Sequence, residues 1–147
     1  MQDLHGSMDG GCLCGAVRYT LRSPALFVSQ CCCKDCQKAT GTGHATVVAV
    51  LQDQLDVTGT PAVYASQGGS GGQVRRHFCA VCAGRLYTSA DSAGPLRMVQ
   101  AGSLDDPNAV TPTAAIYVKN ALTWDRIDPA LAKFDHLPPG PPSSPNP

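Results

Sequence analysis

The sequence has few aromatic and few charged side chains. Aromatic residues make up 5% and charged residues 15% of its 147 residues, and the formal net charge is zero. It therefore lacks the strong basic field with which nucleic-acid-binding proteins attract phosphates. No apolar run approaches the roughly 18 residues that a membrane helix needs. We expect neither a nucleic-acid nor a membrane partner, and a modest core that benefits from cross-links.

The beginning of the sequence also lacks the apolar segment of a secretory signal peptide. We therefore expect a cytoplasmic protein in a reducing compartment, where cysteines bind metals or act in catalysis more often than they form disulfides. Residues 1–9 are expected to be a leader or a disordered start, and the proline-rich residues 138–147 a disordered tail. One domain is predicted between them, over residues 10–137. The oligomeric state does not follow from the sequence.

Short strand patterns separated by turn residues dominate this domain. Strands are predicted at 16–21, 45–51, 55–58, 62–64, 74–78, 85–88, 96–101 and 115–118. One short helix is predicted at 34–40, ended by Gly41, and a second, shorter turn at 129–134. The glycine-rich stretch 67–72 is expected to connect two strands as a hairpin. These patterns predict a mainly β fold.

Cysteine is the residue that the sequence does supply, with eight in three short groups. Two cysteines separated by one or two residues can bind one zinc ion through a tight loop, and Zn²⁺ prefers four ligands in a tetrahedron. The first and last groups each supply one such pair. Together they predict a closed structural zinc site with four ligands, Cys12, Cys14, Cys79 and Cys82.

The middle group predicts a second zinc site, which is open. Cys31, Cys33 and Cys36 supply three ligands and leave the fourth position for water or substrate, as in catalytic zinc sites. Two Zn²⁺ ions per chain are therefore expected. Cys32 is left over and is expected to point away from the ion. His44 follows the predicted helix and is a candidate general base, because imidazole titrates near neutral pH.

Other interpretations of these residues stay open. The cysteines could form disulfides, although their tight spacing argues against it. Both zinc sites could be structural, with Cys32 or His44 completing the second one. A lone histidine is more often structural than catalytic. Five cationic side chains are candidates for holding substrate carboxylates: Lys34, Lys38, Arg75, Arg76 and Arg85. Side chains of this kind are more often solvated surface charges.

The motifs around the cysteines are GCLCGAVRY at 11–19, CCCKDCQK at 31–38, FCAVCAGRLY at 78–87 and, later, AGSLDDP at 101–107. In this order they resemble the motifs of the glutathione-dependent formaldehyde-activating enzyme family, over about residues 10–137. The resemblance implies an Mss4-like β-tent, in which zinc pins small antiparallel sheets accompanied by one or two short helices. It also implies the same division of the cysteines into a structural and an active-site zinc.

The activity implied by the resemblance is that of a carbon–sulfur lyase. Such an enzyme adds a thiol such as glutathione to a small aldehyde such as formaldehyde, or removes it. This sequence departs from the family pattern where Cys32 replaces a histidine and Ala83 replaces a glycine. Since Cys32 is beside the expected active-site zinc, two alternatives remain. One is a non-catalytic zinc-binding interaction module, and the other is a zinc lyase or hydrolase acting on a different small electrophile.

Overall fold

β-Strands make up most of the regular structure in this computed structural model, which describes residues 7–69 and 71–139. Within these ranges there is one α-helix, and the mainly β fold predicted from the sequence is confirmed. The predicted leader and tail lie mostly outside the described residues, although Met8 already begins a strand. None of the described helices is long and apolar enough to cross a membrane.

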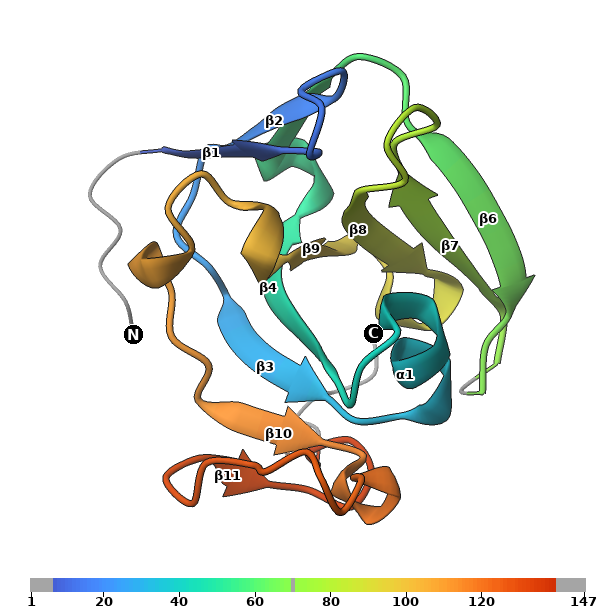
Figure 1. The fold of residues 1–147 in the computed structure, drawn as a ribbon, viewed down its shortest axis with the longest axis vertical. Helices are drawn as coiled ribbons and strands as arrows, with labels where there is room; N and C mark the ends of the chain where they lie inside the picture. Colours follow the sequence, from blue (N-terminus) through green and yellow to red (C-terminus); the bar gives the residue numbers. More distant parts are fainter. Residues whose placement is uncertain (1–6, 70, 140–147) are drawn as a thin grey trace, which may run out of the picture. The chain divides into compact units, whose positions relative to one another are not determined.

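The chain divides into two compact units, each made of two segments that can be followed by colour in Figure 1. The larger unit contains Met1–Val28 and Thr46–Thr111, and the smaller one contains Ser29–Ala45 and Pro112–Pro147. Short 3-10 turns occur in both units, and they are η1 (Gln52–Gln54), η2 (Asp91–Ala93), η3 (Ala101–Ser103), η4 (Pro107–Ala109) and η5 (Val118–Asn120).

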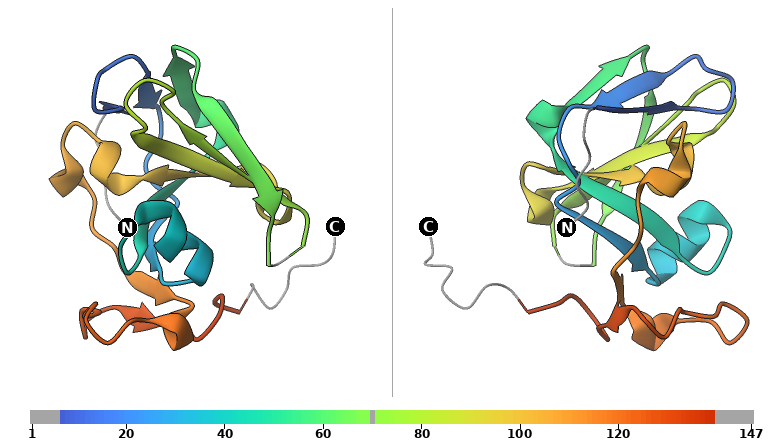
Figure 2. Two further views of the ribbon diagram at one scale, coloured as in Figure 1. Left: turned by 45° about the vertical axis from the view of Figure 1, so that its right-hand side comes forward. Right: turned by 90° about the vertical axis from the view of Figure 1, so that its left-hand side faces the viewer.

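The larger unit contains two antiparallel sheets. The first has the order β1 (Met8–Gly11), β2 (Arg18–Leu21), β5 (Leu55–Thr58). The second has the order β4 (Ala45–Leu51), β9 (Leu96–Gln100), β8 (Arg85–Ala90), β7 (Gln73–Phe78), β6 (Ala62–Gln67). Figures 1 and 2 show β6, β7 and β8 as consecutive neighbours. The predicted hairpin is confirmed, because Gln67 at the end of β6 pairs with Gln73 at the start of β7.

The core of the larger unit consists mainly of aliphatic side chains, as the low aromatic content requires. Leu21, Val48, Val50, Leu86 and Val99 are completely buried there. Each such side chain stabilises the fold by about 1.5–3 kcal/mol relative to an exposed position. The thiol-bearing loops are part of the same cluster of buried residues, which joins the candidate metal site to the core.

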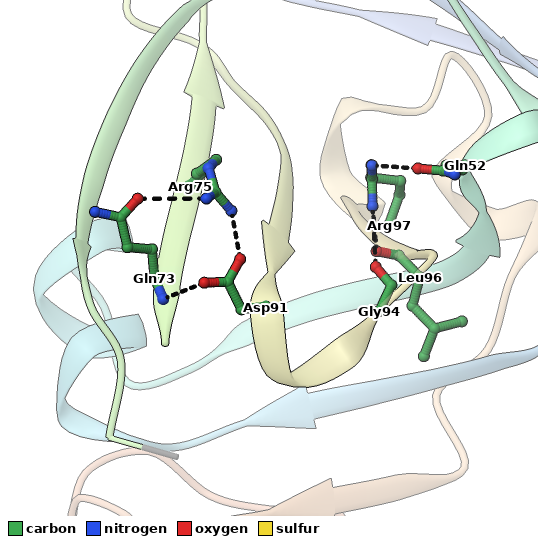
Figure 3. A network of polar contacts seen from close by, with 7 residues as sticks. All are labelled: Gln52, Gln73, Arg75, Asp91, Gly94, Leu96 and Arg97. Carbon is green, nitrogen blue, oxygen red and sulfur yellow. Dashed lines mark hydrogen bonds and ion pairs between the residues drawn. The ribbon is translucent and has the colours of Figure 1, made fainter. Parts of the chain in front are cut away.

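Polar contacts fasten the ends of the strands in the larger unit (Figure 3). Asp91 accepts hydrogen bonds of 2.9 Å from the backbone N–H of Gln73 and from the guanidinium of Arg75. These two donors hold the pKa of Asp91 below its usual value. Arg97 donates to the side chain of Gln52 at 2.6 Å and to the carbonyl of Leu96 at 3.0 Å.

The smaller unit combines α1 (Lys34–Thr40) with three strand segments. β10 (Ala114–Ile116) pairs in parallel with residues 29–31 of β3 (Phe27–Cys31) and with β11 (Ala132–Lys133). The helix has the predicted bounds and ends at Gly41, which has a φ of 76°. At this left-handed position glycine carries no steric penalty.

The predicted second helical turn at 129–134 is wrong in its later part. A turn does form first, closed by the bond from Leu131 N–H to the Asp128 carbonyl at 3.1 Å. The chain then straightens into β11, and the N–H of Phe134 donates to the Ala115 carbonyl at 3.0 Å. Pairing with β10 therefore takes up the backbone groups that a helix would need internally.

Candidate metal centres

Two groups of cysteine sulfur atoms lie close enough together to hold a metal ion. Within each group, the Sγ atoms are all within 4.8 Å of one another. The first group is Cys12, Cys14, Cys79 and Cys82, and the second is Cys31, Cys33 and Cys36. No disulfide is formed by any of the eight cysteines, all of which are among the described residues. The structure thus brings together the two sets that the sequence predicts.

The first group, in the larger unit, has the spacing of a tetrahedral thiolate site. The Sγ of Cys14 lies 3.7 Å from that of Cys12 and 3.7 Å from that of Cys79. Four sulfur atoms at the usual Zn–S length of about 2.3 Å would be about 3.8 Å apart. The two distances from Cys14 match this spacing, and all four sulfur atoms lie within 4.8 Å of one another, so the group fits a tetrahedral thiolate site.

Backbone N–H groups already point at these sulfur atoms. Val17 donates to the Sγ of Cys12 at 3.3 Å, Cys14 to that of Cys82 at 3.4 Å, and Val81 to that of Cys79 at 3.3 Å. Such donors stabilise thiolate charge and orient the ligands. The donors Val17 and Val81 lie in the loops that follow Cys12 and Cys79, so the tight conformation of these loops directs their N–H groups toward the sulfur atoms.

The loop between Cys79 and Gly84 contains one strained residue. The N–H of Ala83 donates to the Cys79 carbonyl at 2.9 Å, and Ala83 has a φ of 63°. This left-handed conformation disfavours any residue with a Cβ atom. At Gly84 a Cβ atom would lie 3.2 Å from the Cβ of Cys12. Gly84 thus allows the two loops to approach, while Ala83 carries strain that a glycine would not.

The thiols of the first group share charge unequally. The N–H of Val17 is the largest influence on Cys12 and lowers its pKa to about 6. At Cys14 the N–H of Ala16 favours the thiolate, but burial and the neighbouring cysteines outweigh it and raise the pKa to about 11. The N–H of Cys14 likewise lowers the pKa of Cys82, so Cys12 and Cys82 are the thiols that ionise more readily than Cys14. A divalent ion would supply the charge needed to ionise the others.

The second group is built around the start of α1 in the smaller unit. Cys31 ends β3, Cys33 is the N-cap of α1, and Cys36 lies in its first turn. The Sγ of Cys33 accepts a hydrogen bond of 3.3 Å from the N–H of Cys36. Contacts with the thiols of Cys31 and Cys36 hold the pKa of Cys33 well below its usual value, whereas that of Cys31 is raised. The helix cap is therefore also one of the three candidate ligands.

Cys32 is not part of this group, as the sequence predicts. Its side chain is completely buried, and burial, followed by the charge of Asp125, raises its pKa. Its backbone N–H donates to the Ile116 carbonyl at 3.0 Å, and its carbonyl accepts from the Gln37 side chain at 2.9 Å. Cys32 thus anchors the ligand loop rather than contributing a ligand atom.

His44 forms a close pair with Asp125, a residue that the sequence analysis did not single out. The Nδ1 of His44 lies 2.6 Å from Oδ2 of Asp125, and the side chains are 23% and 13% exposed. A Cβ atom at Gly43 would lie 2.2 Å from the same carboxylate oxygen. The pair is therefore held tightly. When Nδ1 carries the proton and donates to Asp125, Nε2 is left as an acceptor.

Tyr117 is a second residue of the smaller unit that the sequence did not reveal. It has a φ of 55°, in the left-handed region that bulky residues seldom occupy. Its pKa is raised by burial and then by the negative charge of the three ligand cysteines, so its phenol keeps its proton at neutral pH. Strained residues of this kind cluster at functional sites.

The cationic side chains named from the sequence fall into two sets. In the larger unit Arg75 binds Asp91, Arg76 donates to the Ser66 hydroxyl at 3.3 Å, and Arg85 begins β8. In the smaller unit Lys34 and Lys38 line an open groove of about 420 Å³, which we call the α1 groove. Its lining is completed by Gln37, Gly41, Thr42 and Trp124.

Comparison with known proteins places the chain in a family. Residues 7–120 match the model of the glutathione-dependent formaldehyde-activating enzyme family, so the chain belongs to that family. A Halomonas elongata protein, whose name assigns it provisionally to this enzyme, is 36% identical over 128 residues, which cover 82% of this chain and 81% of that protein.

A solved structure supports the fold. A crystal structure of a Rhodobacter sphaeroides protein superimposes with a TM-score of 0.55 at 22% identity, covering 71% of this chain and 92% of the other. The mainly β architecture, with its open sheets, agrees with the predicted Mss4-like class. The parallel pairing of β10 with β3 and β11 adds a detail that the expected antiparallel sheets did not include.

Proposed function

We propose that the protein is a zinc-dependent carbon–sulfur lyase that adds a glutathione-like thiol to a small aldehyde such as formaldehyde, and catalyses the reverse reaction. The observation that carries this proposal is the group of three sulfur ligands in a chain of this family. Three protein ligands are typical of catalytic zinc sites, whereas four make a closed structural site. Cys12, Cys14, Cys79 and Cys82 would hold the structural ion.

The donor set suits zinc because it consists only of sulfur. Cys31, Cys33 and Cys36 would hold the ion, and the Cys36 N–H would stabilise the charge on Cys33. Bound zinc would supply acidity, since it favours the thiolate form of a coordinated thiol at neutral pH. A soft sulfur substrate matches the site better than a hard oxygen anion would.

In the proposed reaction, a sulfur–carbon bond forms while the π bond of the aldehyde carbonyl breaks. The thiol loses its proton and the carbonyl oxygen gains one, so the reaction is balanced without an oxidant. We assign the transfer of this proton to Nε2 of His44, with Nδ1 held by Asp125. In addition, His44 would take the proton of the thiol as general base and give it to the carbonyl oxygen as general acid; in the reverse direction it would take the hydroxyl proton and return it to the sulfur.

The eight free cysteines fit a reducing compartment, and we place the reaction in the cytoplasm. The proposed substrates are a small thiol and an aldehyde, and neither a nucleic acid nor a membrane takes part. The predicted domain over residues 10–137 would contain both metal sites.

The direct test combines metal analysis with exchange NMR of glutathione and formaldehyde. We expect two zinc ions per chain. We also expect the S-hydroxymethyl adduct of glutathione, a hemithioacetal, to form faster than it does in buffer without protein. Cys33→Ser should lose one zinc and the acceleration, whereas Cys32→Ser should keep both ions. A native protein without zinc, or zinc-loaded protein that accelerates no thiol–aldehyde pair, would refute the proposal and favour the interaction module. Acceleration with other electrophiles only would favour the different lyase or hydrolase.

A further inference from the structure

The α1 groove offers positive charge without a matching carboxylate. Lys34 and Lys38 are one helical turn apart on α1, both are exposed, and neither is paired with another described residue. No acidic side chain is part of the lining. The nearby carboxylate of Asp125 is already bound to His44. The groove is therefore complementary to an anion.

The groove also offers an apolar surface. Trp124 is 65% exposed, although large aromatic side chains are usually largely buried. Its indole faces the same groove as the two lysines. A ligand that combines carboxylates with a flat or aliphatic portion would match both parts of this lining.

Two polar contacts hold the walls of the groove in place. Gln37 donates from one side-chain nitrogen to the carbonyls of Cys32 and Asn120, both at 2.9 Å. The pair of His44 and Asp125 joins the segment that follows α1 to the segment that carries Trp124. These contacts hold Gln37 and the backbone segments on both sides of the groove in place.

From these contacts we infer that the α1 groove is the binding site for the carboxylate-bearing portion of the thiol substrate, with Lys34 and Lys38 pairing its carboxylates and Trp124 covering its backbone. This inference rests on the proposed function. The same short helix carries two of the three sulfur ligands. The helix has seven residues, so it is about 10 Å long, and an extended tripeptide reaches about as far.

The groove would make the enzyme selective for anionic thiols. A neutral thiol such as 2-mercaptoethanol could still react but would gain nothing from the lysines. Gln37 would act as a positioning residue, because it ties the groove to the loop of Cys32. Its hydrogen bonds fix the distance between the carboxylate site and the sulfur ligands.

Binding can be measured without turnover, because Trp124 is the single tryptophan of the chain. The zinc-loaded protein is titrated with S-methylglutathione, which has two carboxylates but no free thiol, and with its diethyl ester. We expect a saturable change of Trp124 fluorescence with the acid and at least tenfold weaker binding of the ester. The double variant Lys34→Gln/Lys38→Gln should bind the acid roughly tenfold more weakly. The control Arg126→Gln, which removes a charge outside the groove, should bind normally.

Equal binding of acid and ester, unchanged binding by the double variant, or no fluorescence response would overturn the inference. Its failure is distinguishable from failure of the proposed function. If the double variant converts glutathione and formaldehyde with an unchanged KM, the groove assignment is wrong and the activity stands. If S-methylglutathione binds through the lysines but no aldehyde is converted, the groove stands and the proposed reaction is wrong.

Discussion

At the scale of single residues, the structure explains both departures from the family motifs. Cys32 is buried away from the sulfur ligands, so its replacement of a histidine leaves the three-ligand group intact. Ala83 replaces a glycine at a position with a φ of 63°, where a side chain is unfavourable. The first departure changes the surroundings of the site, and the second costs stability.

Ala83→Gly should therefore stabilise the protein. Removing the Cβ atom relieves left-handed strain worth about 1 kcal/mol, although the greater freedom of glycine in the unfolded chain offsets part of it. Thermal unfolding of the zinc-loaded protein should show a rise in Tm. The neighbouring change Gly84→Ala is the matched comparison and should lower Tm, because its Cβ would crowd Cys12. A lower Tm for Ala83→Gly would show that the loop does not hold this conformation.

His44 and Asp125 can be separated by conservative changes. His44→Gln should lower kcat by about 10²-fold or more, because the proton acceptor is lost, while both zinc ions remain. Asp125→Asn keeps the size of the partner but not its charge, and should lower kcat less. A His44→Gln variant with normal kcat would show that the pair is a purely structural contact.

At the scale of elements, the sequence predicted correctly those helices and strands whose hydrophobic pattern and end signals both lie within the segment itself. The predicted bounds of α1, β4 and β5 are confirmed. β3 was missed because its burial depends on parallel pairing with β10, more than 80 residues away in the sequence. β11 was missed because it is only two residues long, which is too short to produce a strand pattern in the sequence.

The cysteine groups were predictable because ligand spacing is a local property, but their surroundings were not. Asp125 is 81 residues away from His44 in the sequence, and nothing in the pattern of either segment indicates that they meet. The left-handed Tyr117 and the α1 groove likewise depend on how loops return to the helix. A single sequence therefore indicated the ligands but not the residues that orient them.

Cys33 is both a candidate ligand and the helix cap, and this yields a prediction at the scale of elements. Cys33→Ser should lose the zinc of the smaller unit but keep α1, because serine is a favourable N-cap. Cys33→Ala should lose both the zinc and the cap, at a further cost of about 1 kcal/mol. Zinc analysis and thermal unfolding separate these effects. Equal Tm values for the two variants would show that the cap contributes little.

At the scale of the whole molecule, acid should act in two steps. Zinc should leave first, because its sulfur ligands must be deprotonated and ordinary thiols have a pKa of about 8.5. The pKa values of Asp91 and Asp105 are lowered in the folded state, chiefly by the Gln73 N–H and by Arg18. They contribute stability above the unfolded value of 3.8, which is lost as the pH falls further through their folded values.

These steps can be followed by zinc release and circular dichroism during an acid titration. As the pH falls, zinc should be released first. The secondary structure that remains without the metal should then be lost at a lower pH. Addition of a chelator at neutral pH should reproduce the first step alone. Simultaneous loss of zinc and of all structure in both experiments would show that the fold depends on the metal and would contradict the two-step order.

The first candidate metal site joins cysteines that are far apart in the chain, since Cys14 and Cys79 are separated by 65 residues. In a chain-entropy model of cross-links, closing a loop of this length lowers the conformational entropy of the unfolded chain. This raises the free energy of the unfolded chain by about 4 kcal/mol. During synthesis this site cannot form until its second pair has emerged, whereas the three cysteines of the other site emerge within six residues, at 31–36. The two ions should thus be acquired in a defined order, with the local site filled early and the long-range site completing the fold.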